Sequence, residues 1–355
     1  MTTELKQVSF PPEVLARIVP DVSLQRHLSI GLRPNLRNFL EFKPIEIASN
    51  ENNLTTSNNN IFGSSIIKSG NTTVINTITL GIVENNANEK VEDDVYVSIY
   101  PVVDIQRGRS GAPSDEEMIL SQNLFETILH SKLIPKKSLN IESYGLATNE
   151  DGDIKIFYPN NNETSSSSNE YEDFESQRKR YSFVLFSHIK VFSKVSTIFD
   201  LCHVSILEAL KNVKLPRVYM TDFSTTKIVM KSRNSNTRGL VGINKNNINI
   251  DLNQDLYYDL ELNGDGGVSS NFGAITTTNR SENEDEEPQQ QTVELLADLE
   301  GEAEEATILS RVSIIVDKSE RIKRISLING DNNSEIGLDL LQKAIDVAKL
   351  RAKNV

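Results

Sequence analysis

A repeated order of elements limits the possible folds of this chain most: a group of strands followed by a helix occurs twice along the sequence. Residues 72–83 read TTVINTITLGIV, a β-branched and apolar run that predicts a buried strand. Further strands are expected at residues 95–103, 181–192, 292–299, 310–316 and 322–328. Each group of strands precedes segments with helical periodicity, and this order predicts an α+β protein with two similar layers packed into one subunit.

Three helices follow from capping and spacing. Ser114 with Glu117 three residues later is a capping box, and we expect this helix to end before Pro135. A second helix is predicted over residues 199–213 and a third over residues 334–353. The expected apolar positions are Met118, Leu124, Phe125, Ile128 and Leu129 in the first helix and Leu338, Leu341, Ile345 and Ala348 in the third.

Long polar insertions interrupt this pattern. Asn-rich, Ser-rich or acidic segments lie near residues 50–60, 84–94, 149–176 and 276–291. Such segments hold too little apolar surface to offset the entropy of ordering, so we expect mobile surface loops. The chain is then divided into an N-terminal extension (1–30), a first domain (31–217) with three insertions, and a C-terminal domain (218–355) with the fourth.

Composition and charge bear on the partners and the compartment of the protein. The net charge is −13, but residues 282–305 carry eleven acids and neither Lys nor Arg, which leaves −2 for the rest. An acidic total therefore does not exclude a nucleic-acid partner. A single cysteine, Cys202, forbids an intramolecular disulfide and favours a reducing compartment. No run approaches 18 apolar residues, and no secretory signal is recognisable, so no membrane partner is expected.

Few residues indicate chemistry by themselves. The histidines lack carboxylates or cysteines at metal-ligand spacing, so no metal site is predicted; they are His27, His130, His188 and His203. Cys202 is expected to be a small buried residue, and the GDGG segment at 264–267 a turn. Arg107 and Arg109, in QRGRSG before a helix, fit either a phosphate contact or an ordinary exposed loop.

Several motifs resemble the RNase PH family. Arg33-Pro34-Asn35-Leu36-Arg37 with Glu41-Phe42 is similar to the family's RPDGR…EFR opening, and residues 63–74, GSSIIKSGNTTV, are similar to its GSALVKLGNTTV strand pair. The other matching positions are Phe199-Asp200-Leu201, Ala209-Leu210, Leu215-Pro216, Ala297-Asp298-Leu299 and Glu304-Glu305. Within the family, the chain looks most like the RNase PH-like ring subunits of the eukaryotic RNA exosome.

This resemblance implies an RNase PH fold in a six-membered ring. Its implied partners are the other RNase PH-like ring subunits, cap proteins with RNA-binding domains, an associated catalytic nuclease and RNA, in nucleus, nucleolus and cytoplasm. No cofactor is implied. Arginines in the segment of Arg107 and Arg109 hold RNA near the pore in the family, which makes these two residues the RNA-contact candidates; pairing with a neighbouring subunit is the alternative.

The departures from the family pattern bear on catalysis. Active members carry a Gly-Ser/Thr-Arg phosphate loop where this chain has Thr197, Ile198 and Phe199. Their second aspartate falls near residues 307–310, which hold no acid, so Asp298 is expected to be a structural or interface carboxylate. We therefore expect no catalytic residues and no enzyme activity. The alternatives are an active phosphorolytic 3'-5' exoribonuclease and a stand-alone RNA-binding module, the latter disfavoured by 6% aromatic residues and no Trp.

Overall fold

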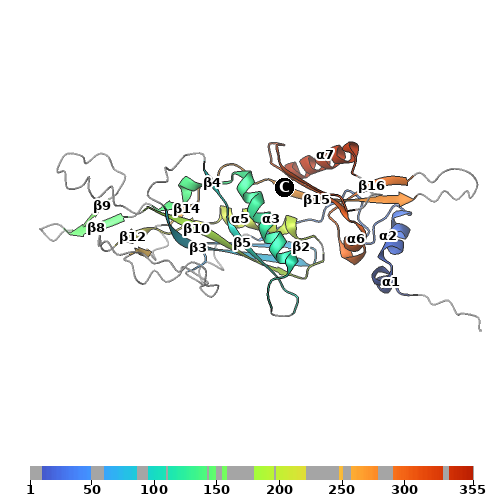
Figure 1. Cartoon of the computed structure of the whole chain (residues 1–355), viewed down its shortest axis with the longest axis horizontal. Helices are drawn as coiled ribbons and strands as arrows, with labels where there is room; N and C mark the ends of the chain where they lie inside the picture. The colour runs from blue at the N-terminus through green and yellow to red at the C-terminus, as the bar shows by residue number, and fades with distance from the viewer. Residues whose placement is uncertain are drawn as a thin grey trace, which may run out of the picture.

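The structure is a computed structural model of the chain, and it shows two layers, the first of which is built on a mixed sheet (Figure 1). The structure describes residues 10–48, 60–85, 95–108, 111–141, 144–148, 154–157, 180–195, 197–220, 248–250, 257–278, 291–330 and 336–354. Most residues of the four polar insertions lie outside these ranges, and so does Arg109.

The first sheet has the strand order β1-β2-β3-β10-β5, and β7 also pairs with β10. Its strands are β1 (Glu46–Ala48), β2 (Gly63–Ser69), β3 (Thr72–Asn85), β5 (Tyr100–Ile105), β7 (Asn140–Ile141) and β10 (Arg180–Phe192). β3 and β10 pair antiparallel along their whole length, from Arg180 opposite Asn85 to Phe192 opposite Thr73. Alternate residues of both strands, among them Ile78 and Ile189, point into the first core, as the period of two requires.

Two helices flank this sheet. α3 (Asp115–Ser131) begins at the predicted capping box of Ser114 and Glu117 and lies along β5. α5 (Phe199–Lys211) is buried on nearly every side, because it covers β2 and β3 on one side and contacts β15 (Val268–Thr278) on the other. α5 therefore lies at the junction of the two layers.

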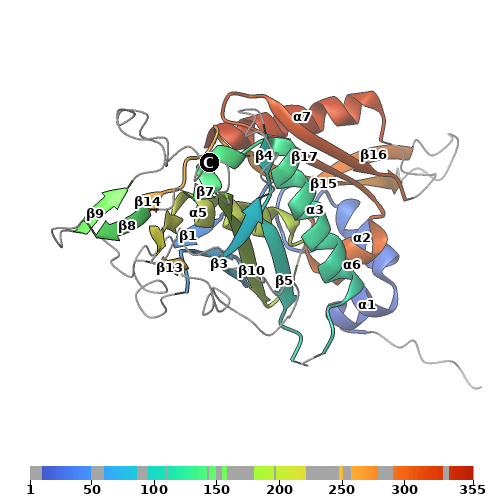
Figure 2. The same ribbon diagram turned by 60° about the vertical axis from the view of Figure 1, so that its left-hand side comes forward.

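The second layer is an antiparallel sheet of order β16-β15-β17-β18. Its other elements are β16 (Gln291–Ala297), β17 (Ser310–Val316), β18 (Ile322–Ile328), α6 (Gly301–Thr307) and α7 (Leu338–Asn354). α7 covers one face of this sheet, and α6 lies on the other side (Figures 1 and 2). The N-terminal helices α1 (Pro12–Ile18) and α2 (Pro20–Leu28) lie beside α6, where Leu24 and Leu28 join a small core with Leu296 and Ile308.

Small elements extend the first layer. They are β4 (Tyr96–Val97), β6 (Ile134–Pro135), the 3-10 helix η1 (Lys136–Leu139), β8 (Tyr144–Thr148), β9 (Ile154–Phe157), β11 (Lys214–Leu215), β12 (Val218–Met220), β13 (Ile248–Ile250) and β14 (Tyr258–Asp259). β12 pairs with β8 and β14 with β11, and the described residues Val218, Tyr257, Leu260 and Leu262 pack with the first core.

The GDGG segment is the turn at which the chain passes from the first core to the second. Leu262 packs on the first core and Val268 belongs to the second. Gly264 and Gly267 have positive φ values of 76° and 81°, which favour glycine. A Cβ on Gly266 would clash with Leu207 Cδ2 of α5, so the turn passes closely against this helix.

The α+β fold with two similar layers is confirmed, whereas several details differ from the sequence predictions. The strand expected at 95–103 is split into β4 and β5, and the hydroxyl of Ser98 between them donates to the Phe125 carbonyl of α3. β9 lies within a segment expected as a loop, and β3 continues to Asn85. Met118 and Leu338 are exposed rather than buried. The other expected positions of α7 do face the second core, with Ala348 buried and Leu341 and Ile345 packed against it, and Ala344 and Ala352 extend this face.

Candidate functional site

The N-terminus of α5 carries Thr197, Ile198 and Phe199, the three positions that the sequence resemblance assigns to the family's phosphate loop. Ile198 is buried in the first core, and Phe199 packs against that core with its ring stacked on His203 at a centroid distance of 6.1 Å. Thr197 Oγ1 is buried without a hydrogen-bond partner among the described residues. Two of the three side chains are thus apolar, and none can supply the bidentate donors of a guanidinium.

In the same first turn of the helix, Asp200 ties α5 to the second layer. Its carboxylate accepts bonds from Ser269 Oγ at 2.5 Å and from the backbone N–H of Asn271 at 3.0 Å. Arg351 of α7 lies 3.8 Å away and also stacks over the Phe42 ring at 4.0 Å. Burial raises the pKa of Asp200 above its usual range, although Arg351 counteracts this. These partners belong to β15 and α7 of the second layer, so Asp200 joins the two layers.

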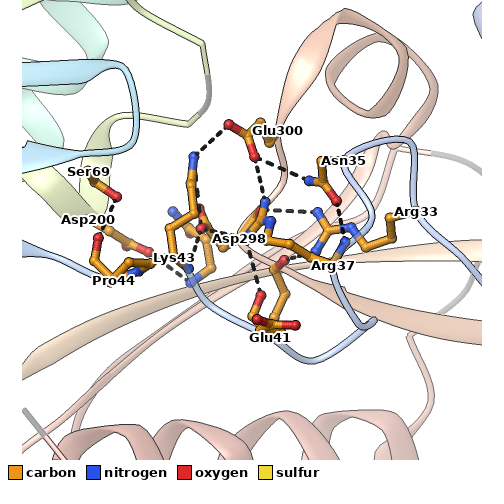
Figure 3. Close-up of polar contacts among 12 residues, drawn as sticks. Arg33, Asn35, Arg37, Glu41, Lys43, Pro44, Ser69, Asp200, Asp298 and Glu300 are labelled. Atoms are coloured by element: carbon orange, nitrogen blue, oxygen red, sulfur yellow. Dashed lines mark hydrogen bonds and ion pairs between the residues drawn. The ribbon is translucent and has the colours of Figure 1, made fainter.

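A second set of charges forms a cluster between residues 33–43 and the β16–α6 turn, and we call it the junction cluster (Figure 3). Its members are Arg33, Asn35, Arg37, Lys43, Asp298, Glu300 and Glu304. Arg37 bonds Asp298 Oδ2 at 3.0 Å and Glu300 Oε2 at 2.9 Å, and the backbone N–H of Lys43 bonds Asp298 Oδ2 at 3.0 Å. Oδ2 of Asp298 therefore accepts bonds from two groups of the segment 33–43.

Arg33 and Glu304 are the most deeply buried members of the junction cluster. Arg33 makes most of the contacts of this pair. It binds Glu304 through Nε and Nη2 and donates to the carbonyls of Ala297 and Asp298. Sequence reasoning noted these residues only as family motifs and missed their pairing. The signal was present, because a basic RPNLR run and an acidic DLEGEAEE run each require a partner once they are buried.

The RNA-contact candidates are only partly placed. Arg107 follows β5 and pairs with Glu116 at the start of α3, with 2.7 Å between Nη2 and Oε2. Glu116 also binds Lys194, which lies three residues before Thr197 and reaches toward Glu305 at 3.8 Å. Arg107 and the α5 N-terminus therefore lie at the same end of the first sheet. Arg109 lies outside the described residues.

The remaining candidates for chemistry are packed groups. Cys202 is fully buried, and burial raises the pKa of its thiol to about 12. His203 is fully buried, and burial lowers its pKa to about 4. Among the described residues, no three His, Cys, Asp or Glu side chains are grouped to hold a metal ion. Nor does any described helix have the length and apolarity needed to cross a membrane.

Comparison with known proteins defines the class. A model of the 3' exoribonuclease family, domain 1 (RNase PH), matches residues 41–216. The fold is that of chains in an Archaeoglobus fulgidus exosome with RNA bound to the active site (TM-score 0.57, 15% identity, 96% of this chain and 97% of the other). An archaeal exosome core matches with TM-score 0.56 and 16% identity over 97% of each chain. Residues 41–216 are thus similar to the RNase PH family, and the chain has the fold of these exosome chains.

Among individual proteins, the chain is similar to the exosome complex component rrp43 of Schizosaccharomyces pombe. The two are 28% identical over 214 residues, a match that covers 60% of this chain and 64% of that protein. The match thus spans somewhat less than two thirds of the relative's length. The family resemblance inferred from the motifs is confirmed.

Proposed function

We propose that this chain is a non-catalytic subunit of the hexameric RNase PH-like ring of an RNA exosome. In this role it helps to assemble the ring and to guide RNA through the central channel for 3'-5' processing and decay of rRNA and other RNAs. Its partners are then the other RNase PH-like ring subunits, the cap proteins, the associated nuclease and RNA, in the nucleus, nucleolus and cytoplasm. The similarity to an exosome component supports the assembly.

The observation that carries the non-catalytic role is the apolar N-terminus of α5. Ile198 and Phe199 are built into the first core, so a phosphate brought to this helix end would meet hydrocarbon instead of a guanidinium. Asp298 supports the same conclusion, since Arg37 and Lys43 already hold its carboxylate. Lys194 is the described basic residue that comes closest before α5 in the sequence, and it is paired with Glu116.

The decisive experiment measures phosphate-dependent release of nucleoside diphosphates from single-stranded RNA. The purified chain, and the ring reconstituted without the nuclease, should release none above background. The competing hypothesis is an active phosphorolytic exoribonuclease. It predicts release of nucleoside diphosphates that is lost in Asp298→Asn and Asp298→Ala. Native mass spectrometry of the co-expressed ring subunits tests assembly independently, with this chain expected at one copy per ring. A ring that forms without it would contradict the structural role.

A further inference from the structure

Asparagine is followed by glycine at two places in this chain, and the local sequences of the two places are almost the same. Residues 262–265 read LNGD and lie where the chain leaves the first core, and residues 328–331 read INGD and begin at the last residue of β18. The two pairs are Asn263-Gly264 and Asn329-Gly330. Glycine leaves the asparagine before it open to attack by the next backbone nitrogen, because it has no Cβ to hinder the approach. Neither pair has a part in the proposed function.

This attack converts the asparagine amide to a carboxylate. The glycine N–H gives its proton to hydroxide, its nitrogen forms a bond to Cγ of the asparagine, and the Cγ–Nδ2 bond breaks as Nδ2 takes up a proton and leaves as ammonia. Water then opens the five-membered imide at either carbonyl, which gives aspartate or isoaspartate. Negative charge develops on Oδ1 during the attack, so a hydrogen bond donated to Oδ1 speeds the reaction. Bonds that hold Nδ2 in place slow it, because the amide must turn toward the attacking nitrogen.

Asn329 has the reactive arrangement. Its Oδ1 accepts a hydrogen bond from the hydroxyl of Ser310, with 3.1 Å between the two oxygens. Ser310 is fully buried at the start of β17, so the sheet fixes the position of this donor. Asn329 itself is exposed to water. Within the part of the chain that the structure describes, no group bonds Nδ2 of Asn329, so the amide nitrogen is free to leave.

Asn263 has the opposite arrangement. Its Nδ2 donates to the hydroxyl of Tyr96 at 3.1 Å and, more weakly, to the carbonyl of Lys132 at 3.4 Å. Its backbone N–H donates to the carbonyl of Leu133 at 2.7 Å. These bonds hold the leaving group, whereas no described residue donates to Oδ1 of Asn263. The contacts of this turn therefore protect Asn263.

The attacking nitrogens do not separate the two sites. The N–H groups of Gly264 and Gly330 lie outside the strands, and neither has an acceptor among the described residues. Crowding would favour the other site, because nothing lies within 4 Å of a Cβ built on Gly264, whereas a Cβ on Gly330 would lie too close to the backbone of Leu309. The hydrogen bonds of the side-chain amides and the crowding of the glycines thus predict opposite orders of reactivity.

We propose that Asn329 is a site of spontaneous deamidation promoted by the hydroxyl of Ser310, and that its contacts protect Asn263. An aspartate at position 329 keeps the bond from Ser310, because a carboxylate oxygen accepts it equally well. An isoaspartate places one extra carbon in the main chain between β18 and α7, the helix that covers the second core. This inference is independent of the proposed exosome role.

The test compares the two pairs within one protein. The full-length chain is kept folded in mildly alkaline buffer, and peptide mapping by mass spectrometry at intervals gives the rate of deamidation at each asparagine. An isoaspartyl methyltransferase counts the isoaspartate. Asn329 should react at least about fivefold faster than Asn263, roughly the effect of one hydrogen bond on a rate. In guanidinium chloride the two rates should converge, because the local sequences are almost the same. Equal rates in the folded chain, faster reaction at Asn263, or a difference that persists in denaturant overturns the proposal.

Two variants test the contacts separately. Ser310→Ala removes the donor to Oδ1 and should slow the reaction at Asn329 about fivefold. A looser fold alone would speed this reaction, so the direction of the change separates promotion by the hydroxyl from a structural effect. Tyr96→Phe frees one bond of Nδ2 and should speed the reaction at Asn263 only. A rate at Asn329 that is unchanged or higher in Ser310→Ala overturns the role of Ser310, and an unchanged rate at Asn263 in Tyr96→Phe overturns the protection. Circular dichroism checks the folding of both variants, and the comparison within the wild type needs neither.

Discussion

Arg33 and Glu304 form a fully buried two-point ion pair between residues 271 positions apart in the sequence, with Nε–Oε1 and Nη2–Oε2 distances of 2.9 and 2.5 Å. Both side chains have further partners, since Arg33 donates to the Ala297 carbonyl and Glu304 accepts from the Glu300 N–H. The pair fastens the segment after α2 to the start of α6. It thereby holds the turn that carries Asp298, whose φ of 48° is in the left-handed region.

Removing one member of this pair should be strongly destabilising. Arg33→Met leaves the Glu304 carboxylate buried without its cation, and we expect a loss of about 3–5 kcal/mol in the free energy of unfolding. Urea denaturation followed by circular dichroism measures this loss. The double variant Arg33→Met with Glu304→Leu should recover only part of it, because the Ala297 carbonyl and the Glu300 N–H lose their partners.

The control is an exposed ion pair between a basic side chain and a glutamate. Lys353 and Glu320 lie 2.6 Å apart with about half of each side chain exposed, and Lys353→Ala should leave the urea midpoint unchanged. An Arg33→Met midpoint equal to that of the wild type would show that the buried pair does not hold the two segments together.

Arg107 and Arg109 give a prediction about RNA. In a reconstituted ring, replacing both by Ala should weaken RNA binding and reduce the slope of log affinity against log salt by up to about 1.4, the value for two phosphate contacts on a single strand. Ring assembly should survive. The matched variant Glu116→Gln removes the acid that engages Arg107, so RNA should bind it at least as tightly as the wild type. Loss of the ring, or an unchanged salt slope, would assign the arginines to an interface or to solvent.

Local rules predicted what depends on neighbouring residues. The capping box of Ser114 and Glu117 and the bounds of β17 and β18 follow from spacing alone, and the structure has them as predicted. The pairing of Arg33 with Glu304 could not be derived in this way, because only the tertiary fold brings such distant residues together.

Met118 shows the opposite case: its position fits a core stripe, but α3 packs at the edge of the sheet and leaves it beside an open groove. Ile198 and Phe199 were singled out only through the family resemblance, and the structure shows that both pack with the first core.

The acidic insertion should be dispensable for folding. Residues 281–290 hold five acids and hardly any apolar surface, and shortening a surface connection changes loop-closure entropy only slightly. We expect their deletion to change the free energy of unfolding by less than about 1 kcal/mol, measured by urea denaturation. The deletion leaves the ends of β15 and β16 joined by a short connection. A cooperative loss of structure would show that the segment is packed.

His203 should make the protein sensitive to acid. Its imidazole is fully buried on α5, and neither ring nitrogen has a hydrogen-bond partner among the described residues. Burial, with a smaller contribution from the positive charge of Arg324, lowers the pKa from 6.5 to about 4. Between these values the unfolded chain binds a proton that the folded chain excludes, so acid favours unfolding.

The free energy of unfolding should therefore be insensitive to this group above about pH 6.5 and fall as the pH drops toward 4. The expected loss is about 1.4 kcal/mol per pH unit, up to about 3 kcal/mol in total. His203→Leu and His203→Gln both abolish the titration, so both should flatten this part of the profile relative to the wild type. Only His203→Leu also removes the unpartnered nitrogens, so it should be the more stable of the two at pH 7.5. Urea midpoints at half-unit pH intervals measure all three proteins, and profiles that run parallel from pH 7 to pH 4 would show that His203 is not the group responsible.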